Sequence, residues 1–194
     1  MTNDSPTTSW DASLTDTLRS VRSVAVIGAS HHEGKLGHAV LWNIVNSGFG
    51  GSVYPINPGA KEILGCRCYP DLTAVQQEID LAVIVIPAHF VLDILKTCGS
   101  HGVKLVVIIT AGFRETGHEG LSAEHKMVEI AREYQMRILG PNCLGLIDTL
   151  VPVNASFAAG MPSNGKIAFM SQSGALCTSV LDFALAQDVG FSSF

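Results

Sequence analysis

The sequence predicts an α/β protein, a Rossmann-like doubly wound parallel sheet followed by the first strand–helix unit of a second domain. Short β-branched apolar runs alternate with segments of helical periodicity. Each run is followed within two residues by Gly, Pro or Thr, which is typical of a strand that enters a turn. Hydrophobic residues make up 47% of the 194 residues and charged residues only 15%, a balance that suits strands buried on both faces.

Five apolar runs have the length of buried strands: Ser23–Ile27, Ser52–Ile56, Leu81–Ile86, Leu105–Ile109 and Arg137–Leu139. Four segments between them have helical spacing: Gly37–Asn46, Leu72–Glu78, Val91–Gly99 and Leu121–Tyr134. A short helix at Ser13–Ser20, with Ser13 as its N-cap, would precede the first strand. Strands joined by helical crossovers run parallel, so the loops after the strands should share one edge of the sheet, where doubly wound folds bind ligands.

The chain is predicted to divide into four parts. Residues 1–15 would form a flexible tail, residues 16–150 the Rossmann-like domain, residues 151–165 a linker, and residues 166–194 the incomplete start of a second domain. In this last part, Lys166–Met170 predicts a strand and Ala175–Ala186 a helix. One strand and one helix cannot bury a core alone. We therefore expect further residues or another chain to complete this unit.

Composition and charge exclude several function classes. The net charge is −5, and no Lys/Arg-rich run indicates a nucleic-acid groove or an anionic membrane surface as a partner. The N-terminus lacks the pattern of a signal peptide, and the apolar runs are too short to span a bilayer. Five cysteines without zinc-site spacing suggest reduced thiols, a cytoplasmic location and no metal centre.

The turn after the first strand is the principal candidate ligand site. It runs from Gly28 to Gly37, and its glycines would let the backbone approach a phosphate at the N-terminus of the next helix. A tight turn that only connects two elements is the alternative. His31 and His32 in this turn fit ligand contact and a solvated loop equally well, and His38 is expected in the first turn of the helix.

The end of the second strand argues against NAD. The first turn is longer than the dinucleotide fingerprint, and the second strand ends in Asn57-Pro58, where NAD sites place an acidic residue for the ribose hydroxyls. The first charge after this strand is Lys61. A cation there suits a phosphorylated ribose, which leaves NADP and the 3′-phosphate of coenzyme A (CoA) as alternatives.

Motifs along most of the chain together resemble one family. They are Gly28-Ala29-Ser30, Pro55-Ile56-Asn57-Pro58 with Lys61, Gly65, Asp80-Leu81-Ala82, Ile86-Pro87-Ala88, Thr110-Ala111-Gly112-Phe113 and Gly140-Pro141-Asn142-Cys143-Leu144-Gly145. This series is similar to the CoA-binding domain of NDP-forming (ADP-forming) acyl-CoA synthetases, a family that resembles the α subunit of succinyl-CoA synthetase. Ser171-Gln172-Ser173-Gly174-Ala175 resembles the start of the family's second, flavodoxin-like domain.

The resemblance implies that five loops hold CoA, through these residues: Gly28, Ala29, Ser30, Lys35, Gly37, Asn57, Pro58, Lys61, Pro87, Ala88, Thr110, Ala111, Asn142 and Cys143. The turn from Gly28 to Gly37 would hold the phosphates, and Lys61 would meet the ribose phosphate. The loop at Pro87 would line the adenine pocket, the loop at Thr110 would touch the pantetheine arm, and Asn142 would lie near the thiol.

Three further residues would serve phosphoryl transfer rather than CoA. The resemblance implies that Ser171, Ser173 and Gly174 stabilise a phosphoryl group at a helix N-terminus. The family's phosphorylated histidine and its ATP-grasp part would lie beyond Phe194. ATP or ADP and Mg²⁺ would then be bound only by other domains or by a partner subunit, and the 194 residues alone would be inactive.

The expected function is therefore CoA or acyl-CoA binding within a ligase that forms acyl-CoA from an acid, CoA and ATP or GTP through a phosphohistidine. Three alternatives remain from the sequence: a stand-alone CoA- or nucleotide-sensing module, part of a protein acetyltransferase of the same architecture, and an NADP-linked oxidoreductase. Cys143 is weighed as a nucleophile, although no adjacent residue would act as its base. Homo-oligomer formation is left open.

Overall fold

The computed structural model describes residues 13–194. Of the tail expected at residues 1–15, residues 1–12 lie outside the described residues, whereas residues 13–15 cap and begin a helix. Helix α1 (Leu14–Arg19) starts at Ser13, whose side-chain oxygen accepts a hydrogen bond of 3.1 Å from the Asp16 N–H. The predicted cap is thereby confirmed, and the tail prediction is wrong for these three residues.

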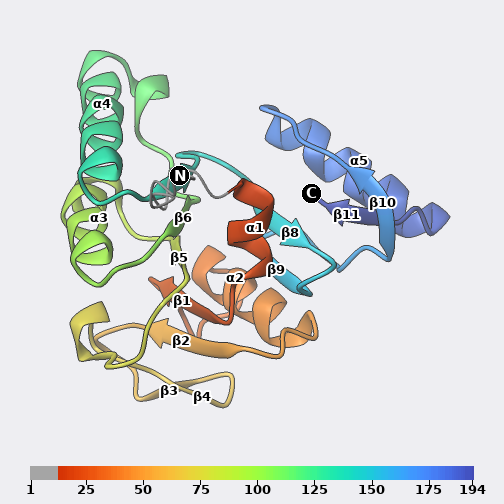
Figure 1. The fold of residues 1–194 in the computed structure, drawn as a ribbon, viewed down its shortest axis with the longest axis horizontal. Coiled ribbons are helices and arrows are strands. Elements are labelled where there is room, and N and C mark those ends of the chain that lie inside the picture. The colour runs from red at the N-terminus through yellow and green to blue at the C-terminus, as the bar shows by residue number, and fades with distance from the viewer. Residues whose placement is uncertain (1–12) are drawn as a thin grey trace, which may run out of the picture.

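A five-stranded parallel sheet forms the centre of the molecule (Figure 1). Its strands are β1 (Ser23–Ile27), β2 (Ser52–Ile56), β5 (Leu81–Ile84), β6 (Leu105–Ile108) and β7 (Arg137–Leu139). Their order is β2-β1-β5-β6-β7, and every neighbouring pair is parallel. The Rossmann-like prediction is confirmed, because the chain moves outward from β1 to β2 and then crosses back to build the other half.

Helices cover both faces of this sheet. Helices α3 (Val91–Ser100) and α4 (His118–Glu133) pack on one face, against residues such as Ala25 and Ile84. Helices α1 and α2 (Leu36–Asn46) pack on the other face, against Val24 and Val83. Because side chains alternate along a strand, a strand buried on both faces contributes to two separate cores.

The connection between β2 and β5 contains no α-helix. It holds a small hairpin, β3 (Glu62–Ile63) with β4 (Cys66–Arg67), and the 3₁₀ turn η1 (Leu72–Ala74). The helix expected at Leu72–Glu78 is therefore wrong. Leu72, Val75 and Ile79 have helical spacing and are all buried, but the backbone turns extended at Val75. Two further 3₁₀ turns, η2 (Ala88–Phe90) and η3 (Arg114–Thr116), precede α3 and α4.

A second sheet follows, with the order β10-β11-β8-β9. Its strands are β8 (Gly145–Asp148), β9 (Val153–Ser156), β10 (Asn164–Ala168) and β11 (Phe191–Ser193), and α5 (Gly174–Gln187) connects β10 to β11. The linker expected at residues 151–165 is wrong in structural terms, because β9 lies within it and is wholly buried. Val153 and Ala155 of β9 join the core under α2, which explains why this segment is ordered into a strand.

Asp80 fixes the edge of the central sheet that lies opposite the strand-end loops. Its Oδ2 accepts hydrogen bonds from the Arg22 N–H at 2.7 Å and from the Ser23 N–H and hydroxyl at 3.0 and 2.9 Å. This carboxylate ties the start of β5 to the start of β1. Within residues 13–194, no helix has the length and apolar character needed to cross a membrane.

Candidate CoA-binding edge

The first turn packs directly on the neighbouring strand at the point where the sheet order reverses. Gly28 has a positive φ of 95°, and a Cβ there would lie 2.3 Å from the carbonyl oxygen of Val85, just beyond β5. A Cβ at Gly37 would lie 2.0 Å from the Gly28 carbonyl oxygen. Both positions therefore require glycine, and α2 begins against the crevice between β1 and β5, where doubly wound folds bind ligands.

The N-terminus of α2 suits an anion. Lys35 is the exposed N-cap residue and makes no side-chain cap, and no acidic residue lies in the first turn. The first N–H groups of a helix have no partner within the helix and carry a partial positive charge. Ser30 does not supply the missing cap, because its Oγ accepts a hydrogen bond from the His32 N–H at 3.0 Å. The turn thus presents backbone donors and the cation of Lys35, and it also carries the exposed carboxylate of Glu33.

Asn57 is a brace between the first two loops. Its Nδ2 donates to the Ala29 carbonyl at 2.7 Å, and its Oδ1 accepts from the Gly59 N–H at 2.7 Å. The resemblance assigned Asn57 to the ligand, but the structure engages both ends of its amide within the protein. Pro58 and Lys61 follow on the exposed surface of the same loop. Lys61 makes no ion pair with any residue of the described chain.

The loops after β5 and β6 are also tied together. The Thr110 hydroxyl donates to the Ile86 carbonyl at 2.7 Å, and a Cβ at Gly112 would lie 3.1 Å from that of Ala88. Pro87 and Ala111 are exposed beside these contacts. The predicted adenine and pantetheine residues therefore occupy adjacent loops with apolar surface open to a ligand.

The loop after β7 completes the edge. Gly140-Pro141 is a cis peptide, and the Asn142 N–H donates to the Thr110 carbonyl at 3.0 Å. The Cys143 thiol lies 3.3 Å from the Ile108 carbonyl, and burial raises the pKa of this thiol to about 11. Such a thiol stays protonated at neutral pH, so the geometry disfavours Cys143 as a nucleophile. Asn142 remains exposed.

The three predicted phosphoryl residues lie in the second unit instead of on this edge. Ser173 is the N-cap of α5, and its Oγ accepts from the Leu176 N–H at 3.3 Å. The Ser171 Oγ accepts from the Ser173 N–H at 3.1 Å. A Cβ at Gly174 would meet nothing within 4 Å, so packing does not demand glycine there. The arrangement is a capped helix N-terminus with exposed donors.

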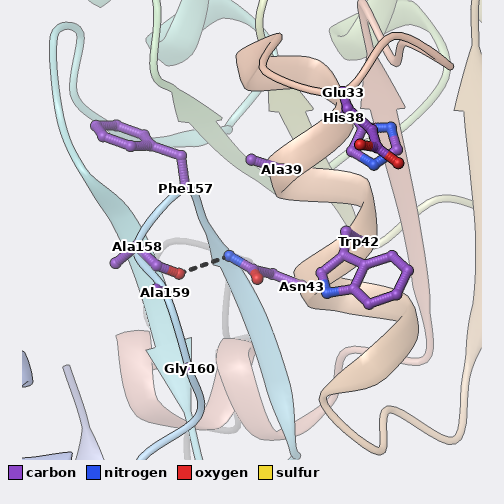
Figure 2. Close-up of a pocket in the computed structure, with 9 residues that line it drawn as sticks. All are labelled: Glu33, His38, Ala39, Trp42, Asn43, Phe157, Ala158, Ala159 and Gly160. Carbon is purple, nitrogen blue, oxygen red and sulfur yellow. Dashed lines mark hydrogen bonds between the residues drawn. The ribbon is translucent and has the colours of Figure 1, made fainter.

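Two surface cavities lie on the described chain, and the lining of one of them includes Glu33 of the glycine turn and His38 of α2. One, of about 380 Å³, adjoins the start of α4 near Arg114 and His118. The other, of about 420 Å³, lies between α2 and residues 157–160 (Figure 2). Asn43 lines this cavity, and its Nδ2 donates to the carbonyls of Ser156 and Ala158 at 2.8 and 2.7 Å. No sequence motif predicted this brace, because an isolated Asn on a helix has no local signature.

Comparison with known proteins shows the family to which this chain belongs. Residues 22–149 match the family model of the CoA-binding domain. The chain belongs to this CoA-binding family. The matched region contains all five strand-end loops, and the resemblance read from the sequence is confirmed.

Relatives of this chain are ADP-forming ligases. It is 46% identical over 169 residues to acetate–CoA ligase [ADP-forming] I of Archaeoglobus fulgidus, covering 87% of this chain and 24% of the relative. It is 47% identical over 173 residues to the α subunit of acetate–CoA ligase [ADP-forming] II of Pyrococcus furiosus, covering 89% and 37%. The chain thus spans only about a quarter to just over a third of the length of these relatives.

Solved structures agree with this picture. The PH0766 protein of Pyrococcus horikoshii superimposes with a TM-score of 0.85 at 47% identity, over 89% of this chain and 39% of that one. An acetyl-CoA synthetase of Candidatus Korarchaeum cryptofilum, described as a complex with phosphate and ADP, gives a TM-score of 0.85 at 41% identity, over 89% and 37%. The likeness extends beyond the matched CoA-binding region, because it covers more of the chain than residues 22–149.

Proposed function

We propose that this chain holds CoA for an ADP-forming acid–CoA ligase, with the CoA diphosphate at the turn from Gly28 to Gly37. The observation that carries the proposal is the contact of Gly28 with Val85 and of Gly37 with Gly28, which brings the uncapped start of α2 to the crevice between β1 and β5. A doubly charged diphosphate suits backbone donors and a helix N-terminus. Family membership supports CoA as the ligand that contains this diphosphate.

We propose that each of the five strand-end loops contacts a different part of one CoA molecule. Across the edge, Lys61 follows β2, the glycine turn follows β1, Pro87 follows β5, Thr110 follows β6 and Asn142 follows β7. Four strand spacings of about 4.8 Å make this edge about 19 Å wide. We assign the 3′-phosphate to Lys61, adenine to the loop at Pro87, the pantetheine arm to Thr110 and the thiol end to Asn142.

We propose that the ligase reaction requires domains or a subunit beyond this chain. The chain covers only 24% and 37% of the two relatives named above as ADP-forming ligases. We assign ATP or ADP, Mg²⁺ and the ATP-grasp part to other domains or to a partner subunit. The start of α5, with Ser171, Ser173 and Gly174, is the proposed phosphoryl subsite, supported by its exposed helix N-terminus. The five free cysteines suit the proposed cytoplasmic location.

Calorimetry of the 194-residue chain tests the CoA assignment. We expect CoA to bind and NADPH to leave CoA binding unchanged. A Lys61→Glu variant should lose roughly tenfold or more in CoA affinity, because it replaces a charge-assisted contact of about 1–3 kcal/mol with repulsion. The affinity of the same variant for dephospho-CoA, which lacks the 3′-phosphate, should fall much less.

A Lys96→Glu variant is the matched control, since Lys96 is an exposed lysine of α3. It should bind CoA as the wild type does. No heat with millimolar CoA would refute the proposed function. An equal loss of CoA and dephospho-CoA affinity in Lys61→Glu would refute the assignment of Lys61 to the 3′-phosphate.

A further inference from the structure

His38 in the first turn of α2 reaches back to the glycine turn. Its Nδ1 lies 3.2 Å from the carbonyl oxygen of Ser30. A carbonyl oxygen only accepts hydrogen bonds, so the contact requires a proton on Nδ1, in either the neutral or the charged ring. The imidazole lies nearly parallel to the indole of Trp42, with ring centroids 6.4 Å apart at an angle of 13°. Both side chains come from the same helix (Figure 2).

This contact sets the direction of the next N–H group. The Ser30–His31 peptide is planar and trans, so its N–H points opposite to its C=O. With the Ser30 carbonyl directed at His38, the His31 N–H points away from His38. The His32 N–H, by contrast, turns back to the Ser30 hydroxyl at 3.0 Å. Within the described part of the chain, the His31 N–H donates no hydrogen bond to the protein.

The helix itself cannot retreat from the turn without losing a tight contact. Gly37 precedes His38, and a Cβ at Gly37 would lie 2.0 Å from the Gly28 carbonyl oxygen. The start of α2 is therefore seated on the first residue of the turn. His38 adds a second point of attachment two residues further along the turn, at Ser30. Together they fix the backbone between Gly28 and His31.

We propose that His38 is a positioning residue for the CoA diphosphate. Its Nδ1–H holds the Ser30 carbonyl toward α2 and so leaves the His31 N–H directed away from His38 as an anion donor. This inference rests on the proposed function, in which the diphosphate occupies this turn. Neither the family match nor the sequence motifs assign any role to His38, which the sequence placed only in the first helical turn.

Two variants separate the hydrogen bond from simple packing. His38→Phe keeps a ring against Trp42 but removes the donor. His38→Asn keeps a donor, because Asn Nδ2 occupies the place of His Nδ1. We expect His38→Phe to weaken CoA and dephospho-CoA equally, by roughly fivefold, since both carry the diphosphate and one neutral hydrogen bond is lost. His38→Asn should retain the wild-type affinity for both ligands.

Thermal unfolding of the same variants distinguishes a positioning role from a structural one. Positioning predicts that His38→Phe keeps the wild-type Tm while it loses CoA affinity. Wild-type affinity in His38→Phe, or an equal loss in both variants, would overturn the inference.

A second measurement does not depend on CoA. Nitrogen-15 NMR of the neutral imidazole should find the proton of His38 on Nδ1, and a proton on Nε2 would overturn the inference even if CoA binds. If the wild-type chain binds no CoA, the proposed function fails instead, whereas the NMR result still reports whether His38 holds the Ser30 carbonyl.

Discussion

The two sheets of this molecule are buried to very different degrees. Every residue of β1, β5 and β6 in the central sheet is buried. In β10 of the second sheet, four of five residues are exposed and the fifth is half-buried. Met170 after β10 is 92% exposed and Phe183 of α5 is 64% exposed. The central sheet is covered on both faces, whereas in the second sheet β9 is covered by α2 and β10 is left largely exposed.

The difference shows how the binding edge is stabilised. The glycine turn and the loops beside it extend from strands that carry two complete cores. The start of α5 extends from a unit whose core consists of five buried residues: Leu144, Ile147, Ala158, Cys177 and Leu181. Since local stability follows buried apolar contacts, the proposed CoA site should be far more rigid than the proposed phosphoryl subsite. Three perturbations test this contrast.

The largest effect should come from a pair of matched cavities. Leu95 of α3 and Leu181 of α5 are both fully buried, in the central and the second unit respectively. We expect Leu95→Ala to lower the free energy of unfolding by about 3–4 kcal/mol, because dense surroundings cannot close the cavity. Leu181→Ala should lower it by about 2 kcal/mol, because its neighbours can collapse.

Denaturant unfolding measures the loss in free energy of unfolding for each variant, and hydrogen exchange shows which elements are destabilised. Leu181→Ala should accelerate exchange in β11 and α5 and leave β6 protected. Equal destabilisation by the two variants, with exchange rising in both units, would contradict the contrast between the sheets.

A smaller effect should follow from separating the two units. Asn43→Ala removes both hydrogen bonds from α2 to the carbonyls of Ser156 and Ala158. We expect a loss of about 1–2 kcal/mol and faster exchange after residue 156, with CoA affinity unchanged. Asn46→Ala is the control, because Asn46 bonds only within α2, to the Trp42 carbonyl. If Asn46→Ala destabilises the chain as much as Asn43→Ala, the brace between the units has no special role.

The smallest effect concerns pH. Burial raises the pKa of the Cys98 thiol to about 12, from 9.0 when exposed. Between pH 9 and 12 the folded chain keeps this proton and the unfolded chain loses it. The stability that the protonated thiol contributes is therefore fully present below pH 9 and is lost as the pH rises from 9 to 12. At pH 10 we expect a loss of about 1 kcal/mol. Unfolding between pH 8 and 10.5 should show a steeper decline in the wild type than in Cys98→Ala, and parallel curves would contradict this.

The sequence was sufficient for the central sheet, because each of its strands is a short apolar run that ends at a turn residue. Ser23–Ile27, Ser52–Ile56 and Arg137–Leu139 have the bounds that the runs predicted. The strand β9 was missed because polar residues interrupt the apolar run that would have indicated a buried strand. Its Asn154 and Ser156 are buried and bond to each other at 2.6 Å, and Asn154 also donates to the Gly160 carbonyl at 2.8 Å. Polar residues satisfied inside a strand look like a loop in sequence.

The candidate site was predictable in location but not in its internal contacts. Glycines at strand ends predicted the turn from Gly28 to Gly37 as the site, and the motif series predicted the CoA-binding family. The contacts of Asn57 with Ala29 and of His38 with Ser30 join residues 28 and 8 positions apart through side-chain-to-backbone hydrogen bonds. No local pattern encodes such bonds, because they depend on how the loops meet in space.

The placement of β11 has a consequence for folding during synthesis. Residues 191–193 lie between β10 and β8, two strands that are made earlier. On a ribosome, β10 therefore has no partner in its own sheet until Ser193 has emerged. The central sheet ends at Leu139 and can form while the rest of the chain is still being made. A growing chain would thus form the edge proposed to bind CoA before β10 pairs with β11.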